Sequence, residues 1–166
     1  MADVTLDRLF RQDAWATARM IAHLRSLPEA TLSMTAPSTG WDVAVILAHI
    51  LSGAESYAAR IAGRPERGDP TPPDTHADLE QIAERAEAAW AELRAFAAEN
   101  SDVEVVESDG GRTYRYPRSV VLAQAVYHSI EHRAQLFGVL TANGVPGMTL
   151  DDLDVWSYSE PESTSS

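Results

Sequence analysis

Apolar residues recur at helical spacing along most of the chain. The pattern predicts a first helix over about residues 5–26, ended by Pro28. Its apolar positions are Leu6, Leu9, Phe10, Met20, Ile21 and Leu24. A second helix is predicted from about Trp41 to Ala62, and the turn before it offers Ser38 or Thr39 as the N-cap.

The stretch that follows the second helix, residues 63–74, is predicted to be a connection without helix. It holds four prolines and two glycines, which interrupt any helix. Neither flank can form a core alone, so we interpret it as a crossover inside one domain and expect residues 1–160 to fold as a single unit. Thr75 and Asp78 then resemble a capping box that opens a third helix, which frays near Asn100.

The sequence changes character before the last long helix. Val103–Tyr116 places valines and tyrosines on either side of Asp109-Gly110-Gly111, which predicts a short β-hairpin or an extended loop with a tight turn. Pro117 fits the first turn of a fourth helix, because the amide hydrogen that proline lacks is not needed there. This helix is predicted to run to about Ala142, where Asn143-Gly144 is a stop signal.

The C-terminal segment is expected to cover part of the helices. Asp151–Tyr158 can pack back through Leu153 and Trp156, whereas residues 161–166 are expected to be a disordered tail. The predicted fold class is therefore all-α. It is a four-helix bundle with a long crossover between helices 2 and 3 and a short hairpin or extended loop before helix 4.

Composition argues against nucleic-acid and membrane partners. The 166 residues carry a formal charge of −12 and no run of Lys or Arg, so a broad basic surface is not expected. The absence of cysteine excludes disulfides, thiolate ligands and a cysteine nucleophile of the protein's own. The charged N-terminus does not resemble a signal peptide, and the most apolar stretch, Ala44–Ala54, is too short to span a bilayer. We therefore expect a cytoplasmic protein.

Two of the five histidines share one face of the predicted fourth helix. His128 and His132 are one turn apart, which separates them by about 40° around the helix axis and about 6 Å along it. That spacing lets two imidazoles chelate one ion. The same spacing also arises by chance, with one ring packed in the core and the other exposed.

Polar residues around His128 favour the metal site. Gln124, Glu131 and Gln135 lie within about 60° of it on the helix, and a purely structural apolar stripe would not hold them. These side chains could orient imidazole N–H groups or line a pocket. A solvated edge of the helix is the alternative explanation.

His49 lies in the apolar run AVILAHIL of the second helix. Gly53 is a near neighbour on its face, with Ser52 and Ser56 on the flank, and these small residues leave room beside the imidazole. A core histidine with satisfied hydrogen bonds is the simpler interpretation. As a third nitrogen ligand, His49 would complete a site that leaves coordination positions open for water or substrate.

Two helical motifs carry a family resemblance. Trp41 precedes the second-helix sequence ILAHI at residues 46–50, and the fourth helix contains HSIEHRAQL at residues 128–136. On these motifs the chain resembles the DinB/YfiT-like family of four-helix-bundle metalloenzymes. The resemblance covers nearly the whole chain, although Ala134 stands where the family more often has glycine.

The resemblance implies that His49, His128 and His132 are the ligands of one divalent metal ion, for which zinc, nickel and iron are the candidates. Family members with assigned activities resemble thiol-dependent transferases or isomerases, in which the metal binds the sulfur of a low-molecular-weight thiol. The leading hypothesis is thus a metal-dependent enzyme of this kind acting on a small electrophilic substrate. The alternatives are a metal-dependent hydrolase and a non-enzymatic, stress-related protein that binds a metal or another ligand.

The far side of the predicted fourth helix suggests a homodimer. Its apolar residues are Leu122, Val126, Ile130, Phe137 and Leu140. A bundle helix needs one apolar face, and this helix has two. We therefore expect a dimer interface there, with burial under the C-terminal segment as the alternative.

Overall fold

Four long helices form the bulk of the protein, which is described here from a computed structural model covering residues 4–99 and 102–159. They are α1 (Val4–Arg25), α2 (Val43–Ala62), α3 (His76–Ala98) and α4 (Arg118–Ala142). The shorter elements are the 3-10 helices η1 (Glu29–Ser33) and η2 (Asp151–Leu153), the strands β1 (Glu104–Asp109) and β2 (Arg112–Pro117), and α5 (Val155–Ser159). The mostly helical architecture agrees with the predicted all-α class.

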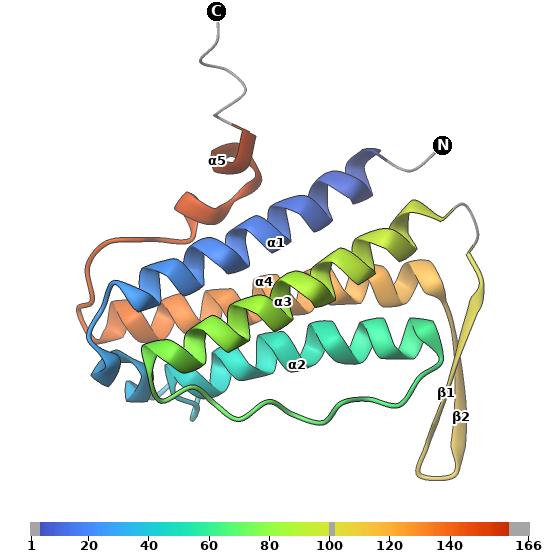
Figure 1. Ribbon diagram of the computed structural model, residues 1–166, viewed down its shortest axis with the longest axis horizontal. Helices are drawn as coiled ribbons and strands as arrows, with labels where there is room; N and C mark the ends of the chain where they lie inside the picture. Colours follow the sequence, from blue (N-terminus) through green and yellow to red (C-terminus); the bar gives the residue numbers. More distant parts are fainter. Residues whose placement is uncertain (1–3, 100–101, 160–166) are drawn as a thin grey trace, which may run out of the picture.

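The long helices run in two directions. Figure 1 shows α1 and α4 running one way along the bundle and α2 and α3 running the other way, with residues 63–74 returning along its length from the end of α2 to the start of α3. Helix α2 packs against α4 and α3, and α1 packs against α3. The largest fully buried side chains come from all four helices, and Phe10 of α1 meets Trp90 of α3 with ring centroids 6.2 Å apart.

The start of α2 differs from the sequence prediction. Its N-cap is Asp42, whose side chain accepts a hydrogen bond from the Val45 amide at 2.8 Å, and neither Ser38 nor Thr39 caps the helix. The Thr39 hydroxyl is already engaged, because it donates to the carbonyl of Trp41 and accepts from its amide. The helix therefore begins two residues later than Trp41.

The other local predictions are matched closely. Thr75 and Asp78 form the reciprocal capping box of α3. The hairpin pairs β1 with β2 through Gly110-Gly111, whose φ angles of 54° and 79° are those of the tight turns that glycine favours. Pro117 ends β2 and occupies the N-cap of α4, one residue before the first turn in which it was predicted.

The C-terminal segment packs on α1, but not through both predicted residues. Leu153 is buried, and its carbonyl accepts a hydrogen bond from the Gln12 side chain. Trp156 is 81% exposed, so the prediction that it packs on the bundle is wrong. Helix α5 makes little more than one turn, so only one of its two aromatic side chains faces α1. That side chain is Tyr158, whose ring centroid lies 5.4 Å from that of Trp15. The predicted tail, residues 161–166, lies outside the described residues.

The apolar residues opposite His128 do not form a second exposed face. Leu122, Val126, Phe137 and Leu140 are buried in the chain's own core, and Ile130 alone among the five is exposed, at 47%. They therefore give the homodimer no support, and the dimer stays a prediction. Within the described residues, no helix is both long enough and apolar enough to cross a membrane.

A buried ion pair joins α1 to α4. Asp13 is fully buried, contacts the guanidinium of Arg133, and accepts a hydrogen bond from the Ser129 hydroxyl at 3.1 Å. Burial raises the pKa of Asp13 to about 6, although Arg133 and Ser129 act in the opposite direction. The second carboxylate oxygen of Asp13 has no hydrogen-bond partner among the described residues, which agrees with a pKa set mainly by desolvation.

The raised pKa predicts how the stability of the metal-free protein depends on pH. The folded state binds the Asp13 proton more tightly than the unfolded state does, so protonation of Asp13 stabilises the fold. This contribution to the free energy of unfolding is fully present below pH 3.8 and is lost as the pH rises through 6. Asp13→Asn cannot titrate. We expect the wild type to gain about 1 kcal/mol relative to this variant when the pH falls from 7.5 to 5. Urea unfolding at both pH values measures the difference, and a pH-independent difference would contradict the prediction.

Candidate metal centre

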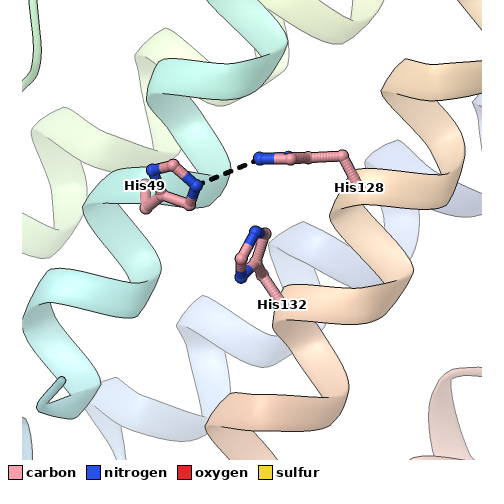
Figure 2. Close-up of side chains that lie close together, drawn as sticks. All are labelled: His49, His128 and His132. Atoms are coloured by element: carbon pink, nitrogen blue, oxygen red, sulfur yellow. Dashed lines mark hydrogen bonds between the residues drawn. The ribbon is translucent and has the colours of Figure 1, made fainter. Parts of the chain in front are cut away.

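Three imidazoles converge between α2 and α4. His49 comes from α2, and His128 and His132 come from successive turns of α4 (Figure 2). One ring nitrogen of each lies within 4.8 Å of the others, and the Nε2 atoms of His49 and His128 are 3.1 Å apart. No other group of three or more potential histidine or carboxylate ligands comes together in the described part of the chain. The cluster can therefore hold a metal ion.

The protonation state of the cluster suits metal binding. Burial, aided by the neighbouring His132 and His49, lowers the pKa of His128 to about 4. Burial and His132 also lower the pKa of His49, and the carboxylate of Asp69 opposes this shift. Both imidazoles are thus neutral near pH 7, and a neutral imidazole is the form that coordinates a metal.

Gly53 allows the close approach of α2 and α4 at the cluster. A Cβ atom at this position would overlap the His128 ring, with its Nδ1 at only 2.6 Å. Tyr57, one turn further along α2, packs edge-on against the same ring with centroids 5.6 Å apart. His128 is therefore enclosed by α2 on the side away from His132.

Of the predicted supporting residues, Gln135 touches the cluster directly. Its Oε1 accepts a hydrogen bond from Nδ1 of His132 at 2.8 Å, which leaves Nε2 of His132 free to bind an ion. Gln124 and Glu131 are exposed, and Gln124 lines a neighbouring cavity. Ser52 and Ser56 form hydrogen bonds with acidic side chains of the crossover, Asp69 and Glu66 respectively.

Three residues near the cluster were not predicted as part of the site, although Trp41 belonged to the motif that carried the resemblance. The Trp41 ring lies 4.9 Å from that of His49 and 6.0 Å from that of His132, measured between centroids. Tyr57 covers His128, and its position one turn after Gly53 was a usable signal. Asp69 comes from the irregular crossover, where no periodicity indicates which side chains face the bundle.

Two cavities of about 270 Å³ each lie on this side of the protein, one lined by His49 and the other by Tyr57. The crossover cavity is lined by Trp41, Val45, His49, Asp69, Pro70 and Pro72, among others. The hairpin cavity is lined by Tyr57, Arg60, Glu107, Tyr116, Val121 and Gln124, among others. His49 borders the first cavity, so a small molecule there would lie beside the cluster. None of the three histidines lines the second cavity, whose wall residue Tyr57 packs against His128.

Gly53→Ala is expected to weaken metal binding, because the added methyl group displaces His128. We expect the affinity for a divalent ion to fall by about 10- to 100-fold, measured by calorimetric titration. Gly138→Ala is the matched control, since Gly138 lies within α4 and has open space around its Cβ position. This control should leave the affinity unchanged and stabilise the fold by about 0.5–1 kcal/mol. Equal affinities for the two variants would show that the approach at Gly53 does not position His128.

The sequence comparisons agree with this geometry. A sequence model of the DinB family matches residues 1–162, which includes α2, α4 and all three histidines. A search of curated protein sequences found no match. On the extent of the family match, the chain belongs to the DinB family.

Proposed function

We propose that the protein is a metal-dependent enzyme in which His49, His128 and His132 hold one divalent ion. The proposal extends to a thiol-dependent transferase or isomerase that acts on a small electrophilic substrate. The observation that carries it is the convergence of three imidazole nitrogens within 4.8 Å on two packed helices.

The donor set fits a divalent metal of intermediate softness. Zinc, nickel and iron all accept imidazole nitrogen. Three protein ligands are typical of catalytic sites, because they leave coordination positions for substrate, whereas structural sites are closed. The lowered pKa values of His49 and His128 favour the coordinating form of both rings.

A divalent ion in such a site lowers the pKa of a thiol that coordinates it. The chain has no cysteine, so a thiol nucleophile would have to come from a small molecule. Gln135 orients the His132 ring, and Gly53 leaves the space that His128 occupies. The crossover cavity, which His49 lines, offers a place beside the cluster for a small-molecule reactant.

His132→Ala is expected to abolish stoichiometric metal binding, because two imidazoles hold a divalent ion far more weakly than three. Elemental analysis of protein purified without added metal gives the readout. His76→Ala is the control, since His76 begins α3 and its ring bonds to the Leu27 carbonyl away from the cluster. Unchanged metal content in His132→Ala would contradict the metal site itself.

The reaction class requires a separate measurement. We expect the metal-loaded protein to consume a low-molecular-weight thiol in the presence of model electrophiles, and metal-free protein and His132→Ala to lack this activity. Cleavage of ester or amide substrates without thiol consumption would contradict the transferase and point to the hydrolase. Metal binding without either activity would favour the non-enzymatic alternative.

A further inference from the structure

The crossover cavity is lined by one carboxylate that pairs with no cation in the part of the chain that the structure describes. This carboxylate is that of Asp69. The three arginines that precede it in sequence have other partners: Arg60 pairs with Glu66, Arg64 with Glu92 and Arg67 with Glu55. Asp69 is the single charged side chain among the residues that line the cavity.

The carboxylate is also held in place. The Ser52 hydroxyl donates a hydrogen bond to Oδ1 of Asp69, which ties the crossover to α2 one turn after His49. Oδ2 of Asp69 takes no part in that bond. Asp69 is close enough to the cluster to act on the pKa of His49. The exposed Asp69 carboxylate is therefore tied to α2 at a position where it lines the crossover cavity.

The remaining walls of the cavity are largely apolar and aromatic. They come from Val45 and Ala48 of α2, from Pro70 and Pro72 of the crossover, and from Trp41, which is 38% exposed. An indole ring attracts cations through its face more strongly than the other aromatic side chains do. The proline and valine side chains instead favour contact with an apolar part of a ligand. The cavity thus combines one anionic group with an aromatic, apolar enclosure.

We propose that the crossover cavity binds a small molecule that carries a protonated amine on an apolar body. The ammonium group lies at Asp69, and the apolar body lies against Trp41, Pro70 and Pro72. A volume of about 270 Å³ suits a compact molecule. The idea that this molecule is the electrophilic reactant rests on the proposed function, but its binding requires neither metal nor thiol.

A competing explanation assigns Asp69 to the metal. A carboxylate near the three imidazoles could instead balance the charge of a bound divalent ion. The two explanations differ in what Asp69→Asn changes. Loss of the carboxylate weakens amine binding in metal-free protein if it recognises a ligand, and weakens metal binding alone if it serves the ion.

The test uses metal-free protein and three probes of one shape and different charge: benzylamine, benzyl alcohol and benzoate. Calorimetric or NMR titration should show benzylamine binding at least about tenfold more tightly than benzyl alcohol, with benzoate weakest. Asp69→Asn should remove this preference and leave the affinity for benzyl alcohol unchanged. The matched control is Asp74→Asn, which removes an exposed carboxylate of the same crossover outside the residues lining the cavity.

Two further variants test the hydrogen bond that positions the Asp69 carboxylate and the indole ring that contacts the ligand. Ser52→Ala keeps the Asp69 carboxylate but removes the hydrogen bond that holds it, so the preference for benzylamine should become smaller without disappearing. Trp41→Leu should weaken binding of both benzylamine and benzyl alcohol, whereas Trp156→Leu, at a largely exposed residue of α5, should change neither. A thermal melt of each variant checks that the fold is retained.

Equal affinities for benzylamine and benzyl alcohol would overturn the proposal. So would an Asp69→Asn variant that loses metal affinity but keeps the preference for the amine. The metal site is judged separately, because His132→Ala should still bind benzylamine. A protein that binds the amine but no metal contradicts the proposed function alone, and one that binds metal but shows no preference contradicts this inference alone.

Discussion

The close contact between α2 and α4 at Gly53 is the constraint on which the site depends. Without a side chain at this residue, the His128 ring can lie against the backbone of α2 and bring its Nε2 to 3.1 Å from that of His49. Close packing leaves no spare volume for an added methyl group. The distance between two ligands on different helices is thus set by the absence of one carbon atom.

A neighbouring face of α4, about 100° around the helix from the histidines, is fixed by charge. Ser129 and Arg133, each directly after a metal-ligand candidate in the sequence, contact the buried Asp13 of α1. A buried ion pair contributes little to stability compared with apolar packing, but breaking it is costly because a charge is left unpaired. Rotation of α4 about its axis would break these contacts. The two histidines therefore keep their direction toward α2.

Local signals in the sequence predicted the elements well. The capping box at Thr75 and the Gly110-Gly111 turn depend on residues a few positions apart, and both are found. The prediction was wrong where side chains compete or where a short helix can present more than one face, as at Thr39 and Trp156. The spacing of His128 and His132 indicated a chelating pair, whereas the approach of His49 and the position of Asp69 depend on packing between distant segments, which no local pattern records.

The candidate metal ligands lie on helices and many cavity residues lie on connections, which affects how such a protein can diversify. The metal-ligand candidates lie on α2 and α4, while much of the wall of each cavity comes from the crossover and from the hairpin. Surface connections tolerate insertion and substitution far better than packed helices do. A relative with an altered crossover or hairpin would therefore present different cavities beside the same three histidines.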